Sequence, residues 1–359
     1  EISLGLVGSE MCIRDRFEQA SKLDNPHAQY QLARMIFNDP SSTPEQTAQA
    51  LERLTKAAEA GQDCAQYALG KIYRDGQGVE KDIQKAVALF TLAATKENSF
   101  AAFALGKLYL AGDAALPRDP AAALKWLTYA AELGNQFAQY RLGKLLLKGD
   151  DGIPKDVITA IRWLTAAAKQ ENGYAEYALA LVYLTGEDAP KDSVKALSLL
   201  KRSAGRGNQF AQYRLGKLLL QGEDAPKDVK AAIRWLTAAA EQGNQYAQYA
   251  LGKLYLLGKE VPKDRSSAIK WFQLAADQGN EYAQYFLKHM DDRLGQPPVA
   301  AVISLFHHLA NIFQEQNQPP PSGGVRVAVD RKLLRKIKAK KIAQGHKADD
   351  HEDVSQHQG

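Results

Sequence analysis

Residues 208–243 read NQFAQYRLGKLLLQGEDAPKDVKAAIRWLTAAAEQG, and most of the chain is a variant of this text. The alanine that opens its Ala-Gln-Tyr core recurs in steps of 36 or 37 residues. It stands at Ala28, Ala65, Ala101, Ala138, Ala175, Ala211, Ala247 and Ala283. A period in this range is typical of a solenoid, in which each unit buries its apolar face against its neighbours. We expect such an all-α solenoid over residues 17–296, with about seven and a half repeats.

Each repeat is expected to form two helices. Asn208 is a good N-cap for the first helix, here called helix A, because its side-chain oxygen can accept from a free amide of the first turn. Gly222 and Pro226 mark the connection, and Asp228 caps the second helix, helix B. Equivalent caps are Asn25, Asn98, Asn135, Asn172, Asn244 and Asn280 for helix A, and Asp82, Asp119, Asp156, Asp192 and Asp264 for helix B. Gln62 breaks the pattern, and Asp63 is expected to cap in its place; Thr43 begins a capping box with Gln46.

A glycine recurs inside helix A, and a tryptophan recurs inside helix B. Gly216 lies in the middle of helix A, where glycine costs about 1 kcal/mol relative to alanine, so it predicts the close approach of another helix. The four tryptophans, Trp126, Trp163, Trp235 and Trp271, share one position of helix B. We expect them to be core residues whose truncation to alanine costs about 3–5 kcal/mol.

The pattern A-x-Y-x-L-G, then P-K-D, then A-x-x-W-x-x-x-A-A-x-x-G-N resembles the Sel1-like repeat, a relative of the tetratricopeptide repeat. It covers about residues 17–290. The resemblance implies a right-handed superhelix of antiparallel helix pairs that binds other proteins, with helix A lining the concave face.

Polar side chains of helix A are therefore the candidate partner-binding residues. They are Gln66, Gln139, Arg141, Glu176, Gln212, Arg214, Gln248 and Gln284. Two interpretations stay open for the glutamines: they contact a partner, or they only solvate an exposed stripe. Charge reversal at Arg141 and Arg214 is expected to weaken partner capture and to leave the helices intact.

Composition and motifs exclude several classes of function. The chain has 359 residues, 45% of them hydrophobic and 24% charged, which is typical of a globular protein. No apolar run approaches the roughly 18 residues of a membrane span. There is no phosphate-binding glycine loop, no zinc-protease motif and no catalytic triad, so we expect no enzyme activity, no cofactor and no metal site. A cytoplasmic location is expected.

Both ends of the chain depart from the repeat. Residues 1–16 resemble translated sequencing-adapter read-through, and we expect that they are not native and that upstream sequence is missing; a short native lead-in is the alternative. After the solenoid, residues 297–316 are expected to form a capping helix, with docking of a partner helix as the alternative, and residues 317–324 a Pro/Gly linker. Residues 348–359 are polar and expected to be disordered.

Residues 325–347 carry a net charge of +8, which exceeds the +5 of the whole chain. They are expected to form a basic helix that is either a solvated tail, a DNA-binding segment or a dock for an acidic partner. The candidate nucleic-acid-binding residues are Arg331, Lys332, Arg335, Lys336, Lys338, Lys340 and Lys341.

This segment, with the Phe306-His307-His308 helix before it, is similar to the C-terminal region of mobilisation relaxases of the MobL or MobP type. Such proteins nick and carry DNA in conjugative transfer, through a nuclease domain that precedes the repeats. No nuclease residue is present, so no catalytic residue can be assigned. The leading hypothesis is a non-enzymatic scaffold that binds another protein through helix A. The alternative is an accessory relaxase region whose basic segment contacts DNA.

Overall fold

The computed structural model describes residues 15–22, 24–39, 41–149 and 152–289. These residues belong to one unit of the chain, and residues 291–359 form another unit. The expected capping helix, linker, basic helix and tail (297–316, 317–324, 325–347 and 348–359) lie outside the described residues, as do residues 1–14.

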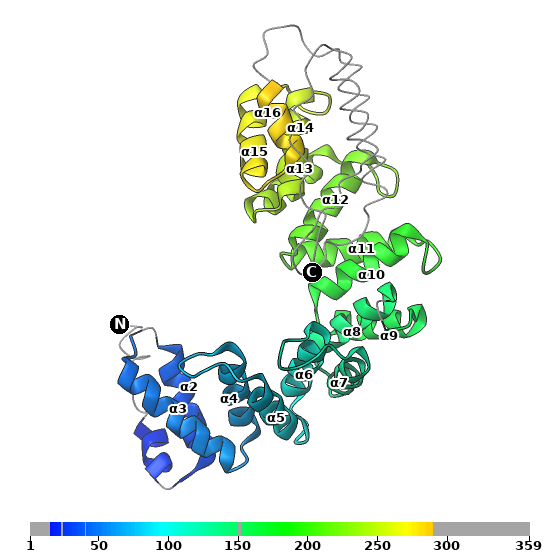
Figure 1. Cartoon of the computed structure of the whole chain (residues 1–359). Helices are drawn as coiled ribbons and strands as arrows, with labels where there is room; N and C mark the ends of the chain where they lie inside the picture. The colour runs from blue at the N-terminus through cyan, green and yellow to red at the C-terminus, as the bar shows by residue number, and fades with distance from the viewer. Residues whose placement is uncertain (1–14, 23, 40, 150–151, 290–359) are drawn as a thin grey trace, which may run out of the picture. The chain divides into compact units, whose positions relative to one another are not determined.

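The described residues form helices that alternate between the two expected kinds. The A helices are α2 (Pro26–Asn38), α4 (Asp63–Asp75), α6 (Ser99–Ala111), α8 (Gln136–Lys148), α10 (Gly173–Thr185), α12 (Gln209–Gln221), α14 (Gln245–Leu257) and α16 (Glu281–His289). The B helices are α3 (Pro44–Glu59), α5 (Ile83–Ala94), α7 (Pro120–Glu132), α9 (Val157–Lys169), α11 (Ser193–Gly205), α13 (Val229–Glu241) and α15 (Arg265–Asp277). Each helix packs on the helices before and after it in the chain (Figure 1). The predicted all-α solenoid of helix pairs is confirmed.

The predicted caps set the helix boundaries. Asn208 accepts from the amides of Phe210 and Ala211 at 3.0 and 3.2 Å, and Asp228 accepts from Ala231 at 2.9 Å. Thr43 and Gln46 form the expected capping box. The prediction for Gln62 is wrong, because its own side chain caps α4. Asp63 instead accepts from the side-chain amide of Asn98 at 2.8 Å, which links two successive A helices.

The helix A glycine lies where helix B of the same repeat comes closest. A Cβ atom on Gly216 would lie 2.7 Å from Leu236 Cγ and 3.0 Å from the carbonyl oxygen of Ala232. Contacts this short exclude a side chain, so the predicted close approach is confirmed. The same contact recurs at Gly70, Gly106, Gly143 and Gly252.

The tryptophans are not the centre of the core. Trp163 is 9% exposed, and Trp126, Trp235 and Trp271 are half-buried. The residue that follows each tryptophan is fully buried and faces the glycine; these residues are Leu127, Leu164, Leu236 and Phe272. The core prediction is therefore confirmed for Trp163, whereas Trp126, Trp235 and Trp271 pack against the edge of the core, and the closest approach of the two helices is filled by the next residue.

Exposed ion pairs join successive loops along the solenoid. The lysine before the helix B cap reaches an acidic residue in the next loop, at 2.6–2.8 Å. The pairs are Lys81–Asp113, Lys155–Asp188, Lys191–Asp224 and Lys227–Glu260. Exposed pairs contribute at most about 1 kcal/mol each, so most of the stability comes from the buried alanine and leucine core.

Candidate functional site

The helix A glutamines are structural links rather than an exposed stripe. Gln212 is 5% exposed, and its Nε2 donates to the carbonyl oxygen of Ala204, the residue eight positions earlier on α11, at 3.1 Å. Gln66, Gln139 and Gln248 are buried in the same way and donate to Ala58, Ala131 and Ala240 at 3.0–3.1 Å. Each bond ties a helix A to the end of the preceding helix B, where carbonyl groups lack partners within their own helix.

A second hydrogen bond reaches three of these glutamines from the following helix B, whereas Oε1 of Gln66 has no partner among the described residues. Gln242, the C-cap of α13, donates to Oε1 of Gln212 at 2.7 Å. Gln278 and Gln170 do the same for Gln248 and Gln139, at 2.8 and 2.9 Å. The expectation that these amides form an exposed stripe is therefore wrong for the buried repeats. A contact between these amides and a partner is untested and stays a prediction.

Gln284 differs because the described solenoid ends with its helix. It donates to the carbonyl oxygen of Ala276 at 3.2 Å but is exposed. Among the described residues, no later helix B covers it.

One repeat replaces the glutamine pair by an ion pair. Glu176 on α10 is fully buried, and its carboxylate lies 2.6 Å from Arg202 and 3.4 Å from Arg206, both on the α11 side. A carboxylate cannot donate, and Arg202 instead reaches the carbonyl oxygen of Ala168 at 3.4 Å. Glu176 is thus occupied by internal contacts, and its predicted contact with a partner stays untested.

Aromatic rings form six contact pairs between successive A helices, from α4 to α16. The ring of the fifth residue of each helix contacts the ring of the second residue of the next helix A, with centroids 6.0–6.4 Å apart. The pairs are Tyr67–Phe100, Phe103–Phe137, Tyr140–Tyr174, Tyr177–Phe210, Tyr213–Tyr246 and Tyr249–Tyr282. We call this set of pairs the ring ladder.

The ring ladder is partly open to solvent. Phe100, Phe137 and Tyr174 are 51%, 49% and 55% exposed, which is high for rings that are already in contact with another ring. The sequence prediction of the site omitted these residues, although an aromatic residue at two fixed repeat positions was the signal that could have revealed them. Neighbouring half-exposed apolar rings are a common feature of interaction surfaces.

Basic side chains lie beside the ring ladder. Lys107 Nζ is 4.9 Å from the centre of the Phe103 ring. Burial lowers the pKa of Lys107 below its usual value, and the charges of Arg74 and Arg141 lower it further. Burial also lowers the pKa of Lys144, with Arg141 adding to the effect. The structure therefore brings predicted residue Arg141 together with lysines of α6 and α8.

The second predicted arginine has equivalent surroundings. Arg214 lies close enough to Tyr177, Tyr213 and Lys217 to act on their pKa values. Burial raises the pKa of Tyr213 to about 12, and Arg214 partly opposes this shift. Burial lowers the pKa of Lys217. Arg141 and Arg214 are half-buried and belong to two nearly identical repeats, α8–α9 and α12–α13.

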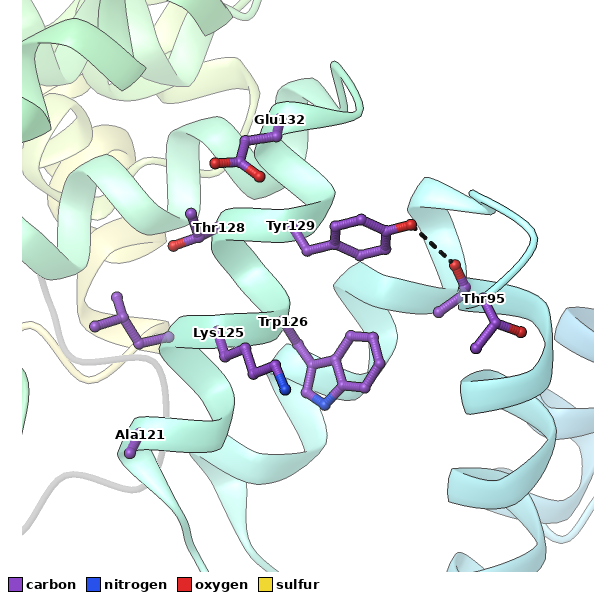
Figure 2. A pocket seen from close by; sticks show the side chains of 9 residues that line it. Thr95, Ala121, Lys125, Trp126, Thr128, Tyr129 and Glu132 are labelled. Carbon is purple, nitrogen blue, oxygen red and sulfur yellow. Dashed lines mark hydrogen bonds between the residues drawn. The ribbon is translucent and has the colours of Figure 1, made fainter.

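The B helices present a different surface. An open hollow of about 700 Å³ lies between α5 and α7 and is mainly apolar. Figure 2 shows Trp126 and Tyr129 directed from α7 toward α5, and the Tyr129 hydroxyl donates to the carbonyl oxygen of Ala94 at 3.4 Å. The lining lacks a converging set of charged groups, so this hollow has no arrangement suited to catalysis.

Other kinds of site were sought in the part of the chain that the structure describes. There, no three His, Cys, Asp or Glu side chains are grouped to hold a metal ion. None of the described helices is long and apolar enough to cross a membrane. The predicted nucleic-acid-binding residues all fall between 331 and 341, outside the described residues.

Several solved structures are similar to this chain, among them the structures of two proteins. One is a protective antigen of uropathogenic Escherichia coli, with 34% identity and a TM-score of 0.67 over 79% of this chain. The chain spans 60% of that protein's length. The other is a Sel1 repeat protein from Oxalobacter formigenes, with 28% identity and a TM-score of 0.58, covering 64% of this chain and 92% of that protein. No curated protein matches the sequence.

The relaxase resemblance receives no support from these comparisons, and the residues that carry it lie outside the described part of the chain. The Sel1 repeat model, in contrast, matches in seven successive stretches. They are residues 26–62, 65–98, 99–135, 136–172, 173–208, 209–244 and 245–280. These matches cover more than half of the chain and coincide with the helix pairs described above, so the chain belongs to the Sel1 repeat family.

Proposed function

We propose that this protein is a non-enzymatic scaffold that binds a partner protein through the face formed by the ring ladder and the cations beside it, here called the helix A face. Sel1 repeat proteins generally act as scaffolds for protein–protein interaction. The observation that carries the proposal is the half-exposed ring ladder, because rings in this state offer apolar area that a partner can bury.

The helix A face also offers specificity. Its basic groups sit beside apolar rings, a mixture typical of interface centres, where aromatic residues and arginine are enriched. By resemblance to related superhelices, we place this face on the concave side. Its width over several repeats suits a long, extended segment of the partner.

Site-specific photo-crosslinking tests which face binds the partner. A benzophenone amino acid is placed either at Phe137 on α8 or at Ile158 on α9, which is 85% exposed and serves as the control in the same repeat. In an extract of the cells that encode the protein, we expect a discrete crosslinked product from position 137 and none from position 158. Equal crosslinking from both positions, or products from position 158 alone, would contradict the assignment of the face.

DNA binding by residues 325–347 is a separate hypothesis, and the net charge of +8 is the observation that favours it. Binding of this kind must weaken as salt rises, because phosphate contacts release counterions. Deletion of residues 325–347 is expected to abolish retention of a DNA duplex at low salt. If the intact chain binds no DNA at low salt, the hypothesis is wrong, and the scaffold proposal is unaffected.

A further inference from the structure

Arg141 and Arg214 each have one hydrogen-bond donor without a partner among the described residues. The Nε atom of each guanidinium is buried and has no acceptor among the described residues. Buried donors almost always have a partner, and one left unpaired costs about 1–3 kcal/mol. The two arginines occupy equivalent positions in the nearly identical helices α8 and α12, so this feature occurs twice.

A lysine lies one helical turn after each arginine. Lys144 follows Arg141 on α8, and Lys217 follows Arg214 on α12, each three residues later and so on the same side of the helix. The influences on Lys144 other than burial are the positive charges of Arg141 and Lys148. Each arginine and lysine pair therefore concentrates positive charge beside the ring ladder.

The helix between the two pairs is different. α10 has no basic residue, and Ala178 and Leu181 stand where α8 has Arg141 and Lys144. Its one acidic residue, Glu176, is buried and paired internally. Along the helix A face, an uncharged aromatic stretch with the half-exposed Tyr174 thus separates two positive sites.

We propose that these two sites bind one extended acidic segment of a partner protein, with one carboxylate group at Arg141 and Lys144 and a second at Arg214 and Lys217. The proposal rests on the scaffold function proposed above and specifies its partner. Carboxylates are the matching acceptors, because an arginine can hold them with two parallel charge-assisted hydrogen bonds. The residues between the two acidic groups are uncharged and lie against the rings of α10.

The helix packing sets the spacing of the acidic groups. Successive A helices meet through the ring pairs Tyr140–Tyr174 and Tyr177–Phe210, so each step is about 10 Å, and α8 and α12, two steps apart, are separated by roughly 20 Å. An extended chain advances about 3.3 Å per residue. The two acidic groups are therefore separated by about five residues.

A single-stranded nucleic acid fits this surface less well than an acidic peptide. Its backbone carries a charge at every nucleotide, whereas the helix A face has an uncharged stretch over α10. Bases would also need free ring faces for stacking, and here each ring of the ladder contacts another ring. Charge spacing and ring packing both favour the peptide.

Fluorescence anisotropy with synthetic peptides tests the proposal on the full chain. The first probe is a labelled peptide with two glutamate pairs separated by about five uncharged residues, two of them aromatic, which spans ~20 Å. The second has the same composition with all glutamates adjacent, and the third has lysine in place of glutamate. We expect the first to bind at least about tenfold more tightly than the second, and the third not to bind.

Matched substitutions locate the binding site. Arg141→Gln and Arg214→Gln are each expected to weaken the first peptide about tenfold, and the double variant about a hundredfold, because distant sites act independently. The control is Arg162→Gln with Arg234→Gln. These arginines are exposed and belong to the B helices of the same two repeats, so the charge change is identical and the face is different. We expect no change in affinity for the control.

Three outcomes would overturn the proposal. They are equal binding of the spaced and adjacent peptides, equal loss in the arginine variants and in the control, and tighter binding of a single-stranded oligonucleotide than of the first peptide. None of these affects the crosslinking result at Phe137. That experiment reports whether the helix A face meets a partner at all, so failure of the partner class and failure of the scaffold function are distinguishable.

Discussion

In five of the repeats, two positions change together, and the pairs they form are chemically matched. One position follows the alanine that recurs in every helix A, and the other lies at the C-terminal end of the next helix B. Three repeats have glutamine at both positions, one has Glu176 with Arg206, and another has Ala102 with Leu133. A buried polar group needs its partner, so these five repeats each keep a matched pair, whereas the repeat of α4 and α5 has Gln66 with Lys96 and leaves Oε1 of Gln66 without a partner among the described residues.

We predict that Glu176 and Arg206 are strongly coupled. Arg206→Gln alone removes one of the two cations that face the buried carboxylate, and it is expected to lower the unfolding free energy more than the double variant does. Glu176→Gln with Arg206→Gln recreates the glutamine pair of the flanking repeats and is expected to cost less than about 1 kcal/mol. Urea unfolding of both single variants and the double variant measures the coupling. Additive losses would show that the two side chains act independently.

The raised pKa of Tyr213 gives the protein a measurable response to alkali. The folded pKa of this residue is raised from 10.0 to about 12 by burial, so the unfolded chain loses this proton first. The stability from this group is complete below about pH 10 and is lost as the pH rises toward 12. Tyr213→Phe should therefore flatten the fall in unfolding free energy between these values, and remove a late-titrating ring from the tyrosinate absorbance. An unchanged profile would place the ring in solvent.

At the scale of the helices, the contact that decides packing is between a glycine of helix A and a fully buried leucine or phenylalanine of helix B. Gly106 faces Leu127, whose Cγ atom would lie 2.6 Å from an added Cβ. Trp126 lies beside this contact and lines the hollow between α5 and α7 (Figure 2). Leu127 fills the tight contact with the glycine, and Trp126 covers that contact from the solvent side.

Truncation separates these two roles. Leu127→Ala is expected to lower the unfolding free energy by about 3 kcal/mol, since it opens a cavity in a fully buried site. Trp126→Ala removes a larger side chain, but one already half in solvent, and is expected to cost only about 1–2 kcal/mol. Thermal and urea unfolding of the two variants provide the comparison. A larger loss from Trp126 than from Leu127 would reverse the assignment of the core.

At the scale of the whole solenoid, the repeats α8–α9 and α12–α13 present nearly the same surfaces to the repeats that flank them. The sequence NQFAQYRLGKLLL occurs at both 135–147 and 208–220. Stability in such arrays is close to a sum of the repeats and their interfaces. A chain that lacks two repeats but keeps its helix interfaces should therefore fold.

Deletion of residues 138–210 joins Phe137 to Ala211 and restores the local sequence of both sites. We expect the shortened chain to keep its helical content per residue by circular dichroism and to unfold at lower urea concentration. One of the two arginine and lysine pairs is lost, so the spaced acidic peptide should bind about as weakly as it does to Arg141→Gln. A molten or aggregated product would show that the two repeats are not equivalent in packing.

The sequence by itself determined the repeat, the order of the helices, nearly all the caps and the tight glycine, because these depend on backbone hydrogen bonds and local conformation. It did not reveal that the glutamines link buried helices or that the residue after each tryptophan is the more deeply buried one, and it left the ring ladder out of the site. These features depend on which side chain of one repeat meets which side chain of the next. Only the packing of α8 on α7 and α9, and of α12 on α11 and α13, buries Gln139 and Gln212. The same packing leaves the Nε donors of Arg141 and Arg214 without a partner among the described residues, beside the ring ladder.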